Sequence, residues 1–299
     1  MTSSIPLQSR PFMTVDVFTA VPYSGNPLAV VLDGRGLDDA QMQSFARWTN
    51  LSETTFVLSP TDAGRAQGAD YRVRIFTPAA EMPFAGYPTL GTCHAWLAQG
   101  GVPQDPTRIV QECAKGLIPI LRSAHGLAFA TPAHQALPLP TQLHLIYEAL
   151  GINATQVRNA AYLDNGARWL CLLLDSTDTV LNMEPDLARI KALGHKVGVA
   201  ALHQADGATP LIRGVSREAQ AQLEVRAFST TGVEDPVTGS LNGSLAQWLI
   251  AQNYLQAPYI ASQGTRVGRN GRVSVQQDSQ QQLWIGGHTV TCVQGTVQL

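Results

Sequence analysis

The sequence predicts an α+β protein made of two pseudo-symmetric lobes, each with a mixed β-sheet or barrel around one central helix. Two glycine-rich segments, 84–92 and 235–244, each have the composition of a helix start. They are 152 positions apart, an offset at which Gly91 corresponds to Gly243. Short apolar runs flank both segments, as expected for strands. The chain therefore looks like two related halves.

The first lobe is predicted to cover 10–131. Apolar and β-branched runs between turn residues indicate its strands, and apolar residues at helical spacing behind Asp38 indicate a helix. Pro88 suits the first turn of the central helix, and the Gly100-Gly101 pair ends it. The expected strands are 15–18, 28–32, 52–58, 71–77, 109–113, 117–122 and 127–131, and the first helix is 37–48.

The second lobe is predicted to cover 141–289, after a proline-rich stretch at 132–140, and a last strand at about 290–299 is expected to pack on the first lobe. The pair Asn270-Gly271 predicts the turn of a hairpin over 267–275. The other expected elements are helices at 143–150 and 185–193, strands near Tyr162 and at 169–174 and 223–228, and the second central helix.

Composition and charge exclude several classes of protein. Hydrophobic residues make up 44% of the chain and charged residues 14%, which favours a compact fold over disorder. The formal net charge is −2 and basic residues occur singly, so no nucleic-acid partner is expected. The sequence has no apolar run of about 18 residues and no secretion signal, which favours a cytoplasmic protein with no membrane partner.

The cysteines and histidines show no metal-ligand spacing, and the sequence has no phosphate-binding loop and no dinucleotide motif. We therefore expect neither a metal nor a cofactor.

Each predicted helix start is a place where an anion could bind. The first N–H groups of a helix have no partner inside the helix, and the helix dipole is positive there. Gly86 and Gly239 would let a ligand approach the backbone closely, although a tight turn alone also requires glycine. Two such starts facing one cleft between the lobes would hold an anionic substrate, with Ser240 beside Gly239.

Three side chains are candidates for acid-base chemistry. Glu53 stands at a helix-to-strand transition among apolar residues, where desolvation would raise the pKa of its carboxyl group. The alternatives are a solvated loop residue or a cap for a neighbouring N–H group. Asp235 precedes the second helix start, where aspartate ordinarily caps the first-turn amides. Tyr87 directly precedes Pro88 and could donate a proton or simply pack.

Taken in order, these segments resemble the PhzF-like phenazine-biosynthesis family, which belongs to the diaminopimelate epimerase fold superfamily. The resemblance extends over nearly the whole chain and implies two pseudo-symmetric lobes with a cleft between them, often in a homodimer. The motifs that carry it are 15–18, 25–27, 50–56, 74–78, 84–91, 234–240, and 263–264 with 268–269.

The resemblance also implies roles for residues. Glu53 stands at the family's acid/base glutamate, and Asp235 at an aspartate that helps hold the substrate or its proton. Tyr87 replaces the histidine of the family's Phe-Ala-Gly-His-Pro motif. Its ordinary pKa is about 10, against about 6.5 for histidine, so Tyr87 would donate a proton but accept one poorly. Because Tyr87 replaces this histidine, the substrate could differ from that of the phenazine enzyme.

The related epimerases use one cysteine at each helix start, and neither start carries a thiol here. The hypothesis is therefore a cofactor-independent isomerase of a biosynthetic process, in which Glu53 removes and returns a carbon-bound proton of a small carboxylate-bearing metabolite. Asn26 and Ser52 are expected to orient this substrate. The alternatives are a racemase or epimerase that uses two non-cysteine groups, and a non-catalytic protein that binds small anions.

Overall fold

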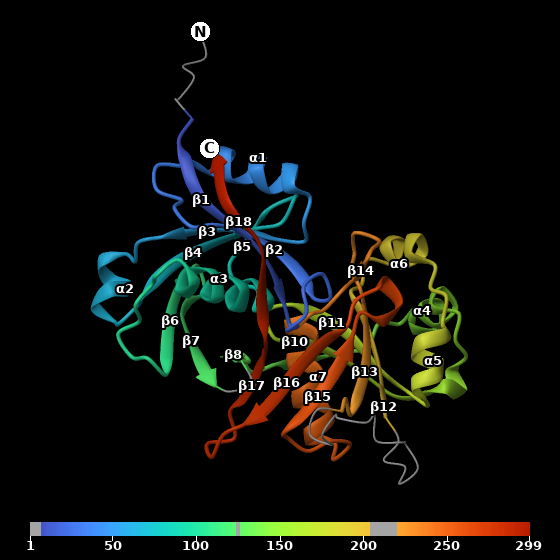
Figure 1. The fold of residues 1–299 in the computed structure, drawn as a ribbon. Coiled ribbons are helices and arrows are strands. Elements are labelled where there is room, and N and C mark those ends of the chain that lie inside the picture. The colour runs from blue at the N-terminus through green and yellow to red at the C-terminus, as the bar shows by residue number, and fades with distance from the viewer. Residues whose placement is uncertain (1–6, 124–125, 204–219) are drawn as a thin grey trace. The chain divides into compact units, whose positions relative to one another are not determined.

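The computed structural model describes residues 7–123, 126–203 and 220–299 (Figure 1). Within these residues the chain divides into two compact units. The first unit consists of residues 7–23, 27–129 and 288–299, and the second of residues 24–26 and 130–287. Each unit has mixed β-structure and one central helix.

In the first unit, parallel and antiparallel pairs alternate, with β2 parallel to β3, β3 antiparallel to β4 and β4 parallel to β6. Helix α3 packs against strands β1, β3, β6 and β18 and is the central helix. The strands are β1 (Ser9–Val17), β2 (Asn26–Val31), β3 (Thr54–Leu58), β4 (Tyr71–Phe76), β5 (Glu81–Met82), β6 (Arg108–Cys113), β7 (Gly116–Ser123), β8 (Gly126–Ala130) and β18 (Thr289–Gln298), and the helices are α1 (Asp39–Thr49), α2 (Asp62–Ala66) and α3 (Gly86–Ala98).

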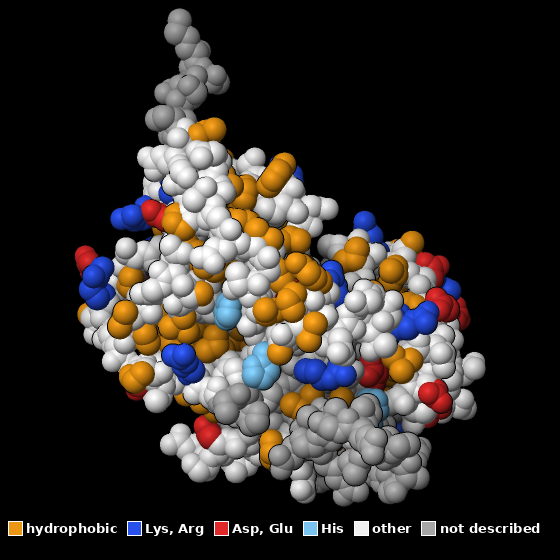
Figure 2. Space-filling model, in the orientation of Figure 1, with side chains coloured by type: hydrophobic (Ala, Val, Ile, Leu, Met, Phe, Trp, Pro, Cys, Tyr) orange, Lys and Arg blue, Asp and Glu red, His pale blue; other side chains and the backbone are white. Residues whose placement is uncertain are grey.

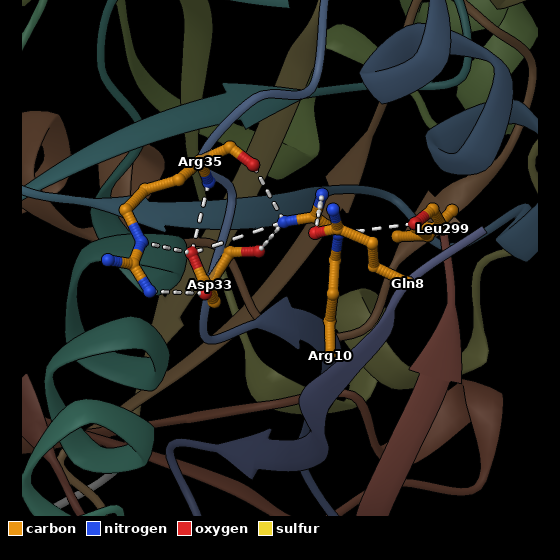
Figure 3. A network of polar contacts seen from close by, with 5 residues as sticks. All are labelled: Gln8, Arg10, Asp33, Arg35 and Leu299. Carbon is orange, nitrogen blue, oxygen red and sulfur yellow. Dashed lines mark hydrogen bonds and ion pairs between the residues drawn. The ribbon is translucent and has the colours of Figure 1, made fainter. Parts of the chain in front are cut away.

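The C-terminal strand β18 completes the first unit by pairing antiparallel with β1 along its whole length, as the red and blue ribbons show in Figure 1. Arg10, only 5% exposed, holds the end of this strand (Figure 3). Its guanidinium donates to the carbonyl oxygens of Leu299, Asp33 and Arg35 at 3.3, 2.7 and 2.8 Å. One buried cation on β1 thus fixes the 33–35 turn and the C-terminal residue, because charged donors make strong hydrogen bonds to carbonyl groups.

In the second unit, α7 is the central helix and packs against β10, β11, β16 and β17. A separate hydrophobic core forms where α4, α5 and α6 cover β11, β12 and β13. The strands are β9 (Gln135–Leu137), β10 (Val157–Asp164), β11 (Arg168–Leu174), β12 (Val197–Leu202), β13 (Leu223–Phe228), β14 (Glu234–Asp235), β15 (Tyr259–Gln263), β16 (Gly271–Gln277) and β17 (Leu283–Gly287), the α-helices are α4 (Leu143–Leu150), α5 (Thr177–Asn182), α6 (Leu187–Leu193) and α7 (Gly239–Ala251), and the 3-10 helices are η1 (Ala154–Gln156) and η3 (Thr265–Val267).

The two units repeat one order of elements. The series β4, β5, α3, β6, β7 in the first unit corresponds to β13, β14, α7, β15, β16 in the second. Gly91 explains part of the sequence repeat, because a Cβ atom there would lie 2.6 Å from Leu28 Cδ2 and 2.9 Å from Val17 Cγ2. A Cβ atom on Gly243 would lie 2.5 Å from Thr131 Oγ1. Both central helices therefore approach their neighbours too closely for a larger residue.

Several predicted elements are confirmed. The helix expected at 143–150 is α4, the strand expected at 223–228 is β13, and the helix expected at 37–48 is α1, which begins behind the capping box of Asp38 and Gln41. The predicted hairpin over 267–275 is wrong. Residues Thr265–Val267 form η3, and β16 begins only at Gly271. Gly264 and Gly268, both left-handed, make the turn into and out of η3, so the Asn-Gly pair follows the turn.

Surface charge and helix length agree with the composition. The Lys and Arg side chains visible in Figure 2 are scattered and form no continuous stripe on that face. In the part of the chain that the structure describes, no helix is both long and apolar enough to span a membrane.

Candidate functional site

The two central helices differ from most other helices in how they begin. Helices α1, α2, α5 and α6 are each capped by a side chain, from Asp38, Thr61, Ser176 and Asp186. Neither α3, behind Ala85, nor α7, behind Thr238, has a side-chain cap among the described residues. Amides of an uncapped first turn can bind an anion, and the helix dipole favours negative charge there.

The start of α3 is buried. Gly86 and Tyr87 form its first turn, and Tyr87 is only 5% exposed. A chain of hydrogen bonds supports this turn from behind. Gln111 Nε2 donates to Thr89 Oγ1 at 2.9 Å, and Thr89 Oγ1 donates to the carbonyl oxygen of Ala85 at 2.9 Å. The backbone of the N-cap residue Ala85, two positions before Tyr87, is thus held by side chains of α3 and β6.

Glu53 lies between the end of α1 and the start of β3 and is half-buried, while Ser52 beside it is exposed. One carboxyl oxygen of Glu53, Oε2, is fully buried. The next residues fix its position, because Thr55 is fully buried and its hydroxyl group accepts a hydrogen bond from Thr92 of α3 at 2.9 Å. Glu53 therefore directly precedes a strand that is tied to the central helix of its own unit.

Asp235 ends β14, just before α7, and is half-buried. Its Oδ1 accepts from Asn26 Nδ2 at 2.9 Å, and its Oδ2 accepts from the Thr238 hydroxyl at 2.6 Å. Desolvation raises the pKa of Asp235 to about 6, against the lowering effect of these two hydrogen bonds and of the positive charge of Lys196; the negative charge of Glu234 adds to the rise. Asp235 thus changes its charge near neutral pH.

The expectation that Asp235 caps the second helix is wrong. The N-cap residue is Thr238, and the carboxyl group of Asp235 accepts from two side chains instead of from first-turn amides. The reason is geometric. Asp235 is the last residue of β14 and pairs with Ala227 of β13, so it is not at the N-cap position of α7.

Asn26, predicted to orient the substrate, is fully buried. Both protons of its amide group are used inside the second unit, on Asp235 Oδ1 and on the carbonyl oxygen of Val237 at 2.8 Å. In this structure Asn26 orients the carboxyl group of Asp235 and the segment that leads into α7. Its role toward a substrate stays a prediction.

Gly239 and Ser240 form the first turn of α7, and Gly239 is buried. Two side chains that the sequence analysis did not identify hold Ser240. Trp169 Nε1 donates to Ser240 Oγ at 3.1 Å, and Asn165 Nδ2 donates to its carbonyl oxygen at 2.9 Å. Lys196 lies over the Trp169 ring, with Nζ 5.5 Å from the ring centroid. Trp169 belongs to β11, Asn165 to the loop between β10 and β11, and Lys196 directly precedes β12. No local sequence motif predicts these contacts.

The side chain of Gln263 makes four hydrogen bonds to residues around the start of α7. Its Oε1 accepts from the backbone N–H of Thr238 at 3.1 Å and from Asn242 Nδ2 at 2.9 Å. Its Nε2 donates to the Asp235 carbonyl oxygen at 3.1 Å and to Thr238 Oγ1 at 3.0 Å. The signal for Gln263 was present in the sequence, because 263–264 is one of the motifs of the family resemblance, but the motif alone gave it no role.

Metal and thiol chemistry find little support in the described residues. No three His, Cys, Asp or Glu side chains among them are grouped so that they could hold a metal ion. Burial raises the pKa of the Cys93 thiol to about 12, and it raises the pKa of Cys171 as well. Thiols with raised pKa values are poor nucleophiles at neutral pH.

Comparison with known proteins identifies the family. The family model for PhzC-PhzF, described as phenazine biosynthesis-like protein, matches residues 15–295. The chain is 32% identical over 304 residues to antisense-enhancing sequence 1 of Schizosaccharomyces pombe, covering 95% of this chain and 97% of that protein. It is 33% identical over 298 residues to trans-2,3-dihydro-3-hydroxyanthranilate isomerase of Pseudomonas fluorescens, covering 96% and 99% of the two chains.

A solved structure agrees with the fold. The crystal structure of the Bacillus anthracis phenazine biosynthesis protein of the PhzF family superposes with a TM-score of 0.80 at 24% identity, and the match covers 98% of this chain and 100% of that one. The predicted fold class is thereby confirmed, and the named relatives confirm the prediction of an isomerase-family enzyme. The chain belongs to the PhzC-PhzF family of phenazine biosynthesis-like proteins.

Proposed function

We propose that this protein is a cofactor-independent isomerase that moves a proton between two carbon atoms of a small carboxylate-bearing metabolite, with Glu53 as acid and base. The observation that carries the proposal is the half-buried carboxyl group of Glu53, whose Oε2 is fully buried, in the unit whose central helix α3 begins with an uncapped first turn. At the start of α7, burial raises the pKa of a second carboxyl group, that of Asp235, to about 6. Ionisable groups that titrate near the working pH are the most effective in proton transfer.

The proposed reaction needs one base and no external reactant. The ionised carboxylate of Glu53 removes a proton from a carbon atom next to a carboxylate or an unsaturated group, and the C–H electron pair moves into the adjoining π-system. The protonated Glu53 then returns the proton to a different carbon atom, and the π-electrons form the new C–H bond. Substrate and product are isomers, and Glu53 regains its charge.

The negative charge that develops during this step requires stabilisation. First-turn amides at Gly86 and at Gly239 with Ser240 are suited to this role, because fixed donors need no reorganisation when the charge appears. Such donors typically contribute about 3 kcal/mol each to transition-state stabilisation. The phenol O–H of Tyr87 adds a hydrogen-bond donor at the α3 start.

The relative from Pseudomonas fluorescens is named for an anthranilate-derived carboxylate, which makes that compound the first one to test here. We expect the substrate of this protein to share the carboxylate and the activated C–H group. Tyr87, in place of histidine, is the reason to extend the test to other unsaturated carboxylates.

The test uses proton NMR in D₂O with trans-2,3-dihydro-3-hydroxyanthranilate and with a panel of small unsaturated carboxylates. Glu53→Gln removes the base while keeping the size of the side chain, so turnover should fall by about 100-fold or more. Glu184→Gln is the matched control, since the Glu184 side chain is 79% exposed in an ion pair with Arg266, and it should keep full turnover. Full turnover by Glu53→Gln would refute the assignment of the base.

One observation also favours a second candidate, a racemase or epimerase that uses two non-cysteine groups. Asp235, with its raised pKa, could supply a second acid or base. A two-base reaction introduces deuterium from the solvent at the carbon that is inverted, whereas a one-base shift can carry the original proton to its new position. Tight binding of carboxylates with neither turnover nor exchange would instead support an anion-binding protein.

A further inference from the structure

The network around Gln263 determines where the hydroxyl proton of Thr238 points. Thr238 Oγ1 lies 3.0 Å from Gln263 Nε2 and 2.6 Å from Asp235 Oδ2. The side-chain amide of Gln263 presents N–H protons on this side, because its Oε1 already accepts from the Thr238 N–H and from Asn242 Nδ2. Thr238 Oγ1 must therefore accept from Gln263, and its own proton is directed to Asp235.

This arrangement leaves no choice of amide orientation. Asn242 Nδ2 also donates to the carbonyl oxygen of Thr238 at 2.9 Å, which identifies its nitrogen and hence the oxygen of Gln263 that it meets. Gln263 and Asn242 are both fully buried, so water does not compete for these bonds. The direction of the Thr238 hydroxyl is thus set by buried groups of β15 and α7.

The first unit contains a similar relay, which passes through a threonine inside the central helix instead of its N-cap and has a different end point. Gln111 of β6 corresponds to Gln263 of β15 at the repeat offset, and it is also fully buried. Its Nε2 donates to Thr89 Oγ1, and Thr89 donates to a backbone carbonyl oxygen, that of Ala85. In the first unit the relay ends on a group that cannot titrate, whereas in the second unit it ends on the carboxyl group of Asp235.

We infer that Gln263 is a positioning residue for the site at α7, which acts through the hydroxyl of Thr238 to hold the carboxyl group of Asp235 in one orientation and to favour its ionised form. The Nε2 bond to the Asp235 carbonyl oxygen fixes the backbone of the same residue. This inference deepens the proposed function and rests on it for its role in catalysis, but its physical content can be measured without a substrate.

Other charged groups near Asp235 also affect its pKa, independently of Gln263. Lys196 lowers and Glu234 raises the pKa of Asp235, and Asn26 donates to the other carboxyl oxygen. Glu234 is paired with Arg226 at 2.8 Å. None of these groups bonds to Gln263, so a change at Gln263 reaches Asp235 through Thr238 or through the Asp235 backbone.

The experiment is a pH titration of the full-length protein labelled with ¹³C at the aspartate carboxyl groups, in which Asp235→Asn identifies the signal of Asp235. Gln263→Met keeps the volume but removes the amide, so the Thr238 hydroxyl is released and the pKa of Asp235 should rise by about one unit. Gln111→Met is the matched control, since it removes the equivalent buried amide from the first unit. It should leave the pKa of Asp235 unchanged.

A double-mutant cycle tests the route. Thr238→Val should raise the pKa of Asp235, and the double variant should raise it no further than Thr238→Val alone, because the amide then has no hydroxyl to direct. Additive shifts would overturn the inference, as would an unchanged pKa in folded Gln263→Met or an equal shift in Gln111→Met. Should Gln263→Met not fold, Thr238→Ser decides: a wild-type pKa supports the relay, and a pKa equal to that of Thr238→Val overturns it.

Failure of the proposed function would look different. If Glu53→Gln retains turnover while the titrations behave as expected, then the relay exists and the assignment of the base is wrong. If Glu53→Gln is inactive and the pKa of Asp235 is unchanged in Gln263→Met, then the assignment of the base is supported and the positioning role of Gln263 is refuted.

Discussion

The starts of α3 and α7 share a scaffold but differ in chemistry. In both units a glycine allows the central helix to pack closely, and a buried glutamine on a neighbouring strand supports the first turn. The support ends on the carbonyl oxygen of Ala85 in the first unit and on the carboxyl group of Asp235 in the second. The repeat therefore accounts for the packing, and the departure from the repeat marks the residue that can titrate.

The two glutamines also differ in the number of partners. Gln111 accepts from Tyr71 at 3.0 Å and donates to Thr89, whereas Gln263 bonds to two backbone and two side-chain groups. Burial also raises the pKa of Tyr71 well above its ordinary value, so the phenol stays protonated and acts as the donor to Gln111. The second unit thus depends on its glutamine for more of its hydrogen bonding.

The largest effect on stability should come from removing these amides. Gln263→Leu should lower the free energy of unfolding by about 3 to 5 kcal/mol, since buried groups of Thr238, Asn242 and Asp235 lose partners, and Gln111→Leu by about 2 to 3 kcal/mol. Urea denaturation followed by far-UV circular dichroism measures both values. An equal cost at the two positions would break the comparison, because it would mean that the extra bonds of Gln263 contribute nothing.

The repeated glycines should give the next largest effect. Gly91→Ala places a methyl group against Leu28 and Val17, and the cost of overpacking should lower stability by about 2 to 3 kcal/mol. Gly243→Ala should cost about 1 to 2 kcal/mol, because its one close contact is the Thr131 hydroxyl, which can rotate away, and alanine is the better helix former. Urea denaturation again gives the measurement, and a stabilised Gly91→Ala protein would contradict the close packing of α3.

Sequence patterns predicted the fold well where local signals and tertiary packing agree. The helix expected at 37–48 behind Asp38 is α1, and in the structure the capping box of Asp38 and Gln41 begins it and the left-handed C-cap at Asn50 ends it. The hairpin at Asn270-Gly271 was wrong because the chain turns earlier, through Gly264 and Gly268. Gly264, Gly268 and Asn270-Gly271 are all turn signals within eight residues. Local propensity cannot show which of them forms the turn when tertiary contacts decide.

The candidate site was only partly predictable for the same reason. Asp235 was visible as an acidic residue before a glycine-rich helix start, but its partner Asn26 lies more than 200 positions away in the chain. Trp169 and Asn165, which hold Ser240, show no local pattern that distinguishes them from core and turn residues. A sequence names the groups that can react, whereas the fold decides which neighbours set their orientation and charge.

A smaller effect should appear in the pH dependence of stability. The pKa of Asp235 is raised in the folded protein to about 6 from 3.8, so the folded state binds the proton more tightly than the unfolded state. Stability should therefore fall as the pH rises from 3.8 to 6, and the loss should persist above that window. Relative to Asp235→Asn, which does not titrate, the wild type should lose about 1 to 2 kcal/mol between pH 4 and pH 7.

Urea denaturation at the two pH values provides the test for Asp235. Asp278→Asn is a useful control, because hydrogen bonds from Trp284 and from backbone amides lower the pKa of Asp278, and its contribution has the opposite sign. An unchanged difference between the wild type and Asp235→Asn across this range would mean that the two starts do not differ in ionisation, which would remove the main contrast between α3 and α7.

The smallest effect concerns the second residue of each central helix, which is Tyr87 in α3 and Ser240 in α7. Trp169→Phe keeps an aromatic side chain but replaces the indole by a smaller ring without the N–H donor to Ser240 Oγ, so stability should fall by about 1 kcal/mol or more. Trp48→Phe is the control, since Trp48 is 79% exposed, and it should cost almost nothing. If Trp169→Phe is as neutral as Trp48→Phe, the indole N–H is not needed to hold Ser240, and the α7 start would depend on Gln263 and Asn165 for its shape.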